Sequence, residues 1–420
     1  MTSLAYVALW VFVFALPWER LVSLPGLYIV TRATGMLAVG LTLLAIVMSG
    51  RVRRWRLFHV AALLFVAWAG IGVWILRPVS IPLKYYTFVQ LFVVLWMMWE
   101  LGSTPKRQRG LFMAFLFGAF VPALATVLLY LREAGALRRF SPGGADPNSL
   151  AMTLALAIPI AWYLSMTTRR PLLRWLYRAY IPLGLLAATL TGSRGGMLAA
   201  MVALLVIPLT ITLSPGRLAA AIGLLALSGA LVVAYVPDSV AERLSSTGSE
   251  VERLDFGGRF KLWRAGLNAF AMRPVLGYGV GGFIPAITPE LGSKALVAHN
   301  SFLSVLVEEG MVGLFFYLTM LLSVFFSILR LPRLERRFGL VLLATLGTAL
   351  LPLTWEDQKA AWFIMAALIG MSQLSVRGPR EAAGQPPIRP TVPTGRPVVA
   401  ARSTDRMPAR GRSLDGHVTG

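Results

Sequence analysis

The histidines and the missing cysteines limit the chemistry that this sequence can perform. Among its 420 residues the chain has three histidines and no cysteine, which excludes disulfides, cysteine-ligated zinc, iron–sulfur clusters and thiol catalysis. His299 is the only histidine inside the long polar stretch 238–300. An imidazole titrates near neutral pH and can act as a general base, whereas one histidine without a second histidine or a cysteine nearby does not make a zinc site. We therefore expect no metal and take His299 as the candidate base. The competing interpretation is a hydrogen-bonded structural histidine.

Two arginines could supply the fixed positive charge that a phosphate ligand requires. Arg194 lies in the motif Thr191-Gly192-Ser193-Arg194-Gly195-Gly196, whose small residues would let a ligand approach closely. A guanidinium is always charged, so at the end of a membrane span it pairs, binds an anion or extends to the interface. Arg259 begins a stretch with apolar residues at 260, 263, 267 and 270, which predicts an amphipathic helix lying on the membrane. The N-terminus of that helix would favour an anion beside Arg259.

Three other polar motifs have mainly structural interpretations. The glycines of 277–282 predict tight turns that lead the chain back toward the membrane, because no strand and helix of a dinucleotide-binding unit flank them. Asp146-Pro147-Asn148 predicts a helix start, with the aspartate as N-cap and the proline in the first helical position. Glu308-Glu309-Gly310 predicts a helix end. No pair of carboxylates has a spacing that requires acid–base or metal chemistry.

Composition places most of the remaining residues in membrane-spanning helices. The chain is 57% hydrophobic and 14% charged, where a soluble domain has about a quarter of its residues charged. Many apolar windows are long enough to cross a bilayer. We expect an all-α integral membrane protein with about 12 transmembrane helices, the first of them uncleaved. Nine helices fall in residues 1–236 and three in 311–375, and 237–310 forms one large periplasmic catalytic loop with short amphipathic helices.

The distribution of charge predicts the orientation in the membrane. The net charge of +22 comes largely from arginine clusters between the spans, as the positive-inside rule expects of cytoplasmic loops. These clusters form no single basic face, so we exclude a nucleic-acid partner. Counting the spans places both termini in the cytoplasm and the large loop in the periplasm. Residues 376–420 are rich in proline and arginine and predict a disordered basic cytoplasmic tail, which anionic membrane lipids would attract.

In their order along the chain, these motifs resemble the O-antigen ligase / O-antigen polymerase family over residues 140–375. The resemblance rests on Asp146-Pro147-Asn148, Ser193-Arg194-Gly195-Gly196, Gly258-Arg259-Phe260 with Trp263, Pro274 with Gly277 and Gly279, and His299-Asn300-Ser301-Phe302-Leu303 with Glu308-Glu309-Gly310. It implies transfer of a glycan from undecaprenyl diphosphate to the lipid A–core oligosaccharide at the outer side of the bacterial inner membrane. It also implies an inverting reaction without metal or cofactor, with His299 as the catalytic histidine. The substrate-binding candidates are then Arg194 and Arg259 for the diphosphate, with Arg264, Arg273 and Asn300 in addition.

Two alternatives stay open. A polymerase of O-antigen or exopolysaccharide repeats, or a protein O-oligosaccharyltransferase, would use the same kind of donor. We favour the ligase because the outer loop is one compact block, whereas polymerases of this family tend to have two large outer loops. A lipid-linked oligosaccharide transporter would need polar residues deep within its spans, and the sequence places its charges mainly at the span ends.

Overall fold

The computed structural model describes residues 2–19, 21, 28–76, 82–133, 139–211, 215–237, 240–241 and 259–382. Within these residues the protein is all-α and contains no strand. A helix starts where the sequence has its clearest N-cap signal. Asp146 caps the helix Pro147–Thr167 by accepting a hydrogen bond from the backbone N–H of Ser149 at 2.8 Å, with Pro147 in the first position. The predicted helix start at this motif is therefore confirmed.

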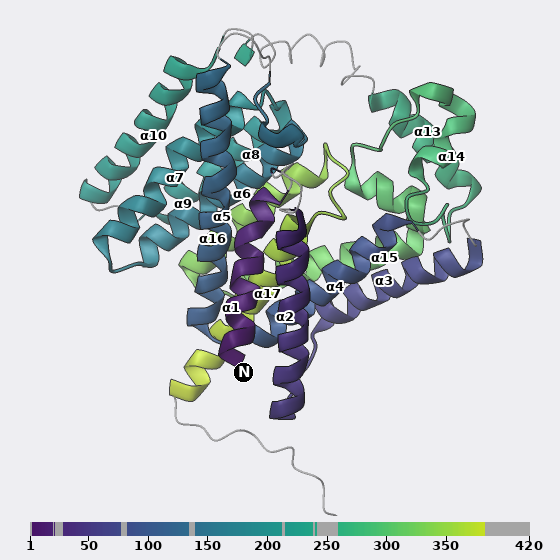
Figure 1. Ribbon diagram of the computed structural model, residues 1–420, viewed down its shortest axis with the longest axis horizontal. Helices are drawn as coiled ribbons and strands as arrows, with labels where there is room; N and C mark the ends of the chain where they lie inside the picture. Colours follow the sequence, from purple (N-terminus) through teal and green to yellow (C-terminus); the bar gives the residue numbers. More distant parts are fainter. Residues whose placement is uncertain are drawn as a thin grey trace, which may run out of the picture. The chain divides into compact units, whose positions relative to one another are not determined.

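Helices occupy both regions that were predicted to contain the transmembrane spans, 1–236 and 311–375 (Figure 1). Among the described residues, six helices are long and apolar enough to cross a membrane. The described residues are therefore compatible with the predicted all-α integral membrane protein, while the number of twelve spans stays a prediction. The helices at these ranges are α1 (Thr2–Ala15), α2 (Tyr28–Ser49), α3 (Leu57–Leu76), α4 (Leu83–Leu101), α5 (Pro105–Arg132), α6 (Pro147–Thr167), α7 (Pro171–Leu190), α8 (Arg194–Leu204) with α9 (Val206–Thr210), α10 (Pro215–Tyr235), α15 (Ser301–Leu329), α16 (Arg333–Leu350) and α17 (Lys359–Ala382).

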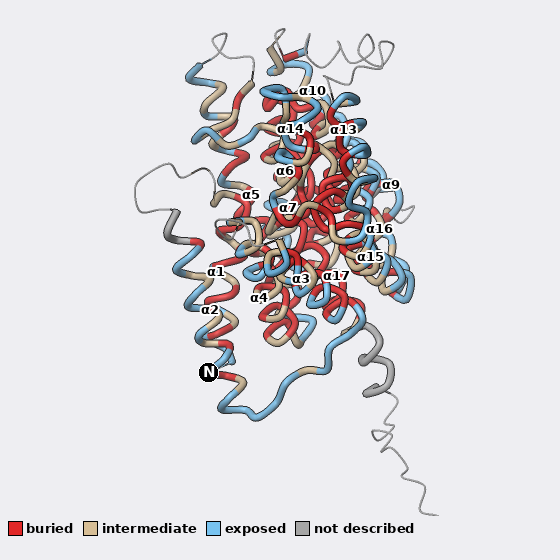
Figure 2. The backbone as a smooth tube through the Cα atoms, turned by 90° about the vertical axis from the view of Figure 1, so that its right-hand side faces the viewer, coloured by how far each residue is buried: buried red, intermediate tan, exposed pale blue. Residues whose placement is uncertain are grey.

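Among the helices that could cross a membrane, α6 is the most deeply buried and α10 the least buried. The most apolar window of α6 is 78% buried, against 11% for α10. Fully buried alanines at 151, 155, 157 and 161 let the neighbouring helices α5, α7, α8 and α16 pack closely on α6. Helix α10 exposes large apolar side chains such as Leu227 and Val233, as a helix bordered by lipid does. In Figure 2 the buried residues concentrate along the central helices.

Helices α13 (Arg259–Met272) and α14 (Phe283–Leu291) form, with the chain up to residue 300, a small unit that we call the lobe. The predicted amphipathic helix is present, but the face that packs differs from the predicted stripe. Helix α13 buries the small side chains around Leu262 and Ala265 against α14 and the start of α15. Phe260 and Leu267 of the predicted stripe are 59% and 53% exposed. Contact of this outer stripe with the membrane surface stays a prediction.

A break at Gly310 divides α15 into two helical parts. Gly310 has φ 67° and ψ −168°, and a Cβ there would overlap the backbone of Val275. The interruption leaves carbonyl groups of the first part available to other donors. Tyr278 N donates to Val307 O at 3.0 Å, and Gly279 N donates to Glu308 O at 2.7 Å. The glycines of 277–282 thus form tight turns against the broken helix, and the helix end predicted at Gly310 is confirmed.

Parts of the predicted domain layout lie outside the described residues. This holds for most of 237–258 and for the predicted tail from residue 383 onward. Helix α17 continues past residue 375, where the sequence predicted the end of the last span, to Ala382. The divisions 1–236, 237–310, 311–375 and 376–420, and the membrane side of each, stay predictions.

Candidate functional site

His299 differs from its neighbours in backbone conformation. With φ 46° it is the one non-glycine residue with a positive φ in the described part of the chain, a conformation that costs about 1–2 kcal/mol. Hydrogen bonds on its own backbone and on the preceding residue stabilise it. The His299 N–H donates to Thr354 Oγ1 at 3.1 Å, and Ala298 O accepts from Trp263 Nε1 at 2.9 Å. The loop before α15 is thereby fixed with His299 half-buried.

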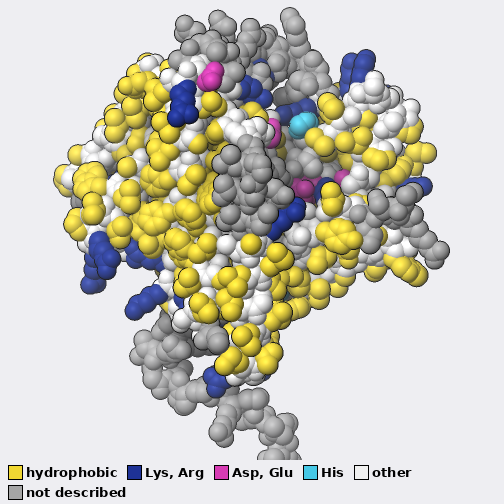
Figure 3. Space-filling view, in the orientation of Figure 1, with side chains coloured by type: hydrophobic (Ala, Val, Ile, Leu, Met, Phe, Trp, Pro, Cys, Tyr) yellow, Lys and Arg dark blue, Asp and Glu magenta, His cyan; other side chains and the backbone are white. Residues whose placement is uncertain are grey.

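Arg259 lies within electrostatic reach of His299, because Trp263 ties the start of α13 to the histidine loop. Arg259 and Trp263 are one turn apart on the same face of α13, so the Trp263 hydrogen bond to Ala298 brings this turn close to His299. Burial and the Arg259 charge lower the pKa of His299, while the Asp146 carboxylate opposes them. The imidazole is therefore neutral at pH 7, which is the form that a general base needs. Figure 3 shows basic, acidic and histidine side chains gathered around a hollow in a mostly hydrophobic face.

Arg194 starts α8, which belongs to the helices packed around α6 (called the bundle below) rather than to the lobe. Ser193 caps this helix by accepting a hydrogen bond from Gly196 N at 3.1 Å. Arg139 donates to Thr191 O at 3.0 Å and to Asn148 Oδ1 at 2.8 Å, which links the turn before α8 to the Asp146-Pro147-Asn148 motif. Asp146 in turn acts on the pKa of His299. Arg194 is thus connected to the histidine loop through the start of α6.

The glycines after Arg194 have a packing role that the sequence did not reveal. A Cβ on Gly196 would overlap Ala151 of α6, and a Cβ on Gly195 would lie 3.0 Å from Met152 Cε. These residues let the first turn of α8 lie directly against α6. The structure therefore explains Gly195 and Gly196 by close helix packing, whereas the sequence suggested close approach of a ligand.

For the three further binding candidates, Arg264, Arg273 and Asn300, the structure shows no direct link to the His299 side chain. Arg264 and Arg273 are exposed, and Arg273 stacks over the Tyr278 ring with 4.8 Å between the guanidinium carbon and the ring centroid. Neither arginine is among the charges that shift the pKa of His299. Asn300 caps α15 by accepting a hydrogen bond from Leu303 N at 3.0 Å. Substrate binding by these three residues stays a prediction.

The six predicted site residues all fall in one segment that matches a known family. Residues 179–318 match the family model described as O-antigen ligase. Over this third of its length the chain is similar to the O-antigen ligase family, which supports the resemblance that the motifs predict. The match and the apolar helices together support a multi-pass membrane protein. Members of the matched family are ligases or polymerases that act on lipid-linked glycans. No curated protein matches the chain.

A buried ion-pair cluster joins this family-matched segment to residues outside it. Lys84 Nζ lies 2.8 Å from Glu308 Oε2 and 2.6 Å from Glu356 Oε1. Ser304 Oγ donates to Glu356 Oε1 at 2.7 Å, and Gly281 N donates to Glu308 Oε2 at 2.9 Å. The two glutamate side chains are 5% and 0% exposed. Since Lys84 and Glu356 lie outside 179–318, α4 and the connection from α16 to α17 also contribute to this region.

The sequence analysis missed this cluster, along with Thr354 and the hydrogen bond of Trp263. Lys84 and Glu308 are 224 residues apart, and in the sequence Glu308 marks a helix end and a motif of the family resemblance, with no indication of a charged partner. One signal could have identified the lysine. It is the single charged residue in the first turns of an apolar helix, where a charge is costly unless it is paired.

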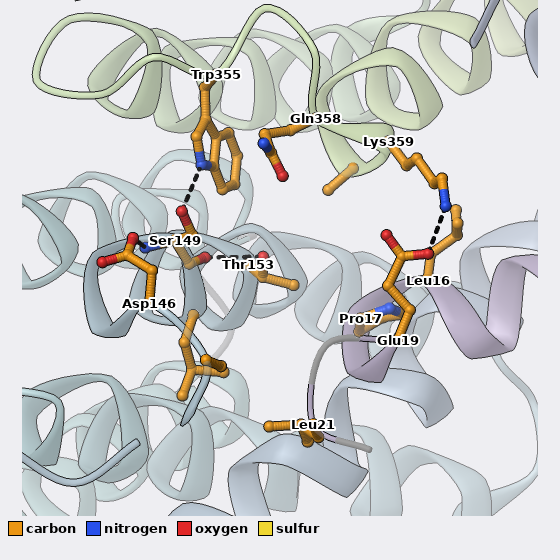
Figure 4. A pocket seen from close by; sticks show the side chains of 13 residues that line it. Leu16, Pro17, Glu19, Leu21, Asp146, Ser149, Thr153, Trp355, Gln358 and Lys359 are labelled. Carbon is orange, nitrogen blue, oxygen red and sulfur yellow. Dashed lines mark hydrogen bonds and ion pairs between the residues drawn. The ribbon is translucent and has the colours of Figure 1, made fainter. Parts of the chain in front are cut away.

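A small pocket lies between the end of α1, the start of α6 and the connection before α17 (Figure 4). Trp355 Nε1 donates to Ser149 Oγ at 3.1 Å, and Lys359 Nζ lies 2.6 Å from Glu19 Oε2. The pocket has a volume of about 40 Å³, room for a few water molecules at about 10–15 Å³ each. Because its polar side chains pair with one another, we assign the pocket a structural role.

Proposed function

We propose that the protein is an O-antigen ligase, which moves a glycan from undecaprenyl diphosphate to a hydroxyl group of the lipid A–core oligosaccharide. One observation carries the proposal. His299 lies in the segment that matches the ligase family and is half-buried within reach of the Arg259 charge. A neutral base next to a fixed cation suits glycan transfer from a diphosphate carrier, because one end of the reaction loses a proton and the other gains negative charge.

In the proposed reaction the histidine and the arginines act at opposite ends of a single displacement. The acceptor hydroxyl oxygen attacks the anomeric carbon of the donor glycan while His299 takes the hydroxyl proton. The bond between the anomeric carbon and the diphosphate oxygen breaks, and the leaving diphosphate keeps the electron pair. Arg259 and Arg194 would stabilise its negative charge through bidentate hydrogen bonds. A single displacement of this kind inverts the anomeric centre, and it uses no metal or cofactor.

The proposed orientation places this reaction on the periplasmic side of the bacterial inner membrane, with both termini in the cytoplasm. Asn300 can still serve the acceptor or donor sugar, because its helix cap uses the side-chain oxygen and leaves the amide group chemically able to donate. Arg264 and Arg273 would add exposed positive charge near the donor.

The test uses the purified full-length protein in detergent with a chelator, an undecaprenyl-diphosphate-linked glycan and lipid A–core as acceptor. We expect His299→Ala to lower transfer by roughly 100- to 10,000-fold, as loss of a general base does. The matched control is His417→Ala, which replaces a histidine in the predicted tail and should keep full activity.

Other outcomes would redirect the proposal. Elongation of the carrier-linked glycan without transfer to lipid A–core would identify a polymerase, which uses the same displacement with another acceptor. Full activity of His299→Ala would overturn the role as base. If neither product forms with the wild-type protein, the transporter alternative gains support.

A further inference from the structure

The Lys84 cluster joins three elements that are distant in the sequence. Lys84 belongs to the first turn of α4, Glu308 to the first part of α15, and Glu356 to the connection between α16 and α17. Lys84 is 14% exposed and the two carboxylates are almost completely buried. Removal of one partner from a buried ion pair leaves an uncompensated charge and is strongly unfavourable. The cluster therefore holds these three elements in one fixed relation.

The same connection is also attached to the first turns of α15 by hydroxyl groups. Ser301 Oγ accepts from Trp355 N at 2.8 Å and donates to Leu353 O at 2.9 Å. Ser304 Oγ donates to the Glu356 carboxylate that Lys84 contacts. Residues 353–356 thus lie along residues 301–304, which directly follow His299 and its helix cap.

Thr354 stands in the middle of this attached stretch and contacts His299 itself. Its hydroxyl accepts the His299 N–H at 3.1 Å, and His299 is the residue with the left-handed backbone. A left-handed histidine persists only where the surroundings stabilise it. A shift of residues 353–356 relative to α15 would move Thr354 and weaken its hydrogen bond to the His299 backbone.

We infer that Lys84 is a positioning residue for His299. It fixes the connection 353–356 against the start of α15, so that Thr354 and the first turn of α15 hold the histidine loop in its left-handed conformation near Arg259. This assignment rests on the proposed function for its effect on glycan transfer. The geometric part, that Lys84 determines the placement of His299, is independent of which reaction the protein catalyses.

Direct binding of the donor diphosphate by Lys84 is a weaker explanation. Two carboxylates already lie within 2.8 Å of the ammonium group. When both are ionised, the three side chains together carry a net negative charge, which repels an anion. Glu309 next to the cluster is also buried. The lysine is thus committed to the protein's own carboxylates.

The first measurement follows His299 without any enzymatic assay. Reaction of His299 with diethyl pyrocarbonate is measured by mass spectrometry across pH, because only the neutral imidazole reacts and its peptide can be distinguished from those of the other histidines. Burial and Arg259 lower the pKa of His299, and Asp146 is the one opposing charge. In Lys84→Met we expect the histidine loop to leave this environment. The reaction should become faster, and its pH midpoint should rise toward the usual value of histidine.

The second measurement is glycan transfer by the same variants. We expect Lys84→Met to lower the rate at saturating donor by roughly 10- to 100-fold, as a small misplacement of a catalytic group does, with the KM for the donor changed by less than about twofold. Thr354→Val should show the same pattern, and Thr354→Ser, which keeps the hydroxyl, should restore the wild-type rate and pH midpoint. An increase in the donor KM with an unchanged His299 midpoint would overturn the assignment in favour of direct diphosphate binding.

The matched control is Lys359→Met. Lys359 is also ion-paired at 2.6 Å, with Glu19, and it follows the same connection, but its pair is more exposed and does not include α15. It should leave both the His299 midpoint and the transfer rate unchanged. An effect equal to that of Lys84→Met would show that any loss of an ion pair near the connection suffices, and would overturn the specific role of Lys84.

Failure of Lys84→Met to fold would not end the test. The triple variant Lys84→Met/Glu308→Gln/Glu356→Gln removes all three charges while keeping side-chain shape, so no charge remains unpaired within the cluster. If it folds with wild-type His299 reactivity, the assignment is wrong; a raised midpoint supports it. Should the wild-type protein transfer no glycan while Lys84→Met still changes His299 reactivity, the positioning role stands and the proposed ligase function falls.

Discussion

Arg194 and Arg259 both begin a helix, yet the two helices are held in different ways. The start of α8 is fixed inside the bundle by the Ser193 cap and by backbone-close packing of Gly196 on α6. The start of α13 belongs to the lobe, where a separate small hydrophobic cluster stabilises it and the indole of Trp263 donates a hydrogen bond to Ala298 O in the His299 loop. The comparison suggests a division of roles. The bundle offers a rigid cation, and the lobe brings the second cation and the histidine together as one unit.

Among the changes that test this comparison, the largest effect should follow from removal of the Arg259 cation in the lobe. We expect Arg259→Ala to lower glycan transfer by roughly 100- to 1,000-fold, as loss of a group that stabilises developing charge does. The same change should raise the pKa of His299, because a positive charge near the imidazole disfavours its protonated form. The rate of glycan transfer and the pH dependence of His299 modification measure the two effects. Lys261→Ala, an exposed cation on the same helix, should change neither.

On the bundle side, Gly196→Ala should act through stability. The added methyl group would overlap Ala151, so α8 and α6 must separate, and overpacking of this kind costs about 1–3 kcal/mol. Thermal unfolding in detergent measures the loss. Gly229→Ala is the matched control, since open space surrounds that position. Equal melting temperatures for the two variants would argue against tight packing at Arg194.

The smallest of these effects tests the hydrogen bond between Trp263 of α13 and Ala298 in the His299 loop. Trp263→Phe keeps an aromatic ring but loses the hydrogen bond to Ala298. We expect a loss of about 0.5–1.5 kcal/mol in the free energy of unfolding and faster modification of His299. Trp74→Phe, at a position that is 72% exposed, should behave like wild type. Unchanged His299 reactivity in Trp263→Phe would mean that the helix bundle, rather than α13, holds the His299 loop.

The helices were predictable from the sequence, because the signal that marks them is local. Long apolar runs mark helices such as α2, α3 and α4, and the Asp146-Pro147 cap marks the start of α6. The turns at 277–282 followed from their glycines. The packed face of α13 was not predictable in the same way. The buried face of α13 consists largely of alanine and glycine, which give only a weak hydrophobic pattern in the sequence. The packing of α14 and α15 against this face is what buries it.

The candidate site was predictable only in part, for a physical reason. His299 stood out as the one histidine in a polar stretch, and Arg259 as the start of a helical pattern. The contacts that place them come from Thr354, Ala298 and Lys84, and such pairings leave no mark in local spacing. In a sequence, a glycine near an arginine that makes room for a ligand cannot be distinguished from one that makes room for a neighbouring helix. At Gly196 the neighbour is Ala151 of helix α6.

The ion pair between Lys84 and Glu308 crosses the boundary of the family-matched segment, and this has a consequence for protein engineering. Residues 179–318 do not make a transplantable module. A chimera that exchanged only this segment between two relatives would combine Glu308 from one parent with a fourth helix from the other, and would bury the carboxylate unpaired unless that helix also offers a cation. Swaps meant to transfer donor or acceptor preference should therefore carry α4 and the connection around Glu356 together with the segment.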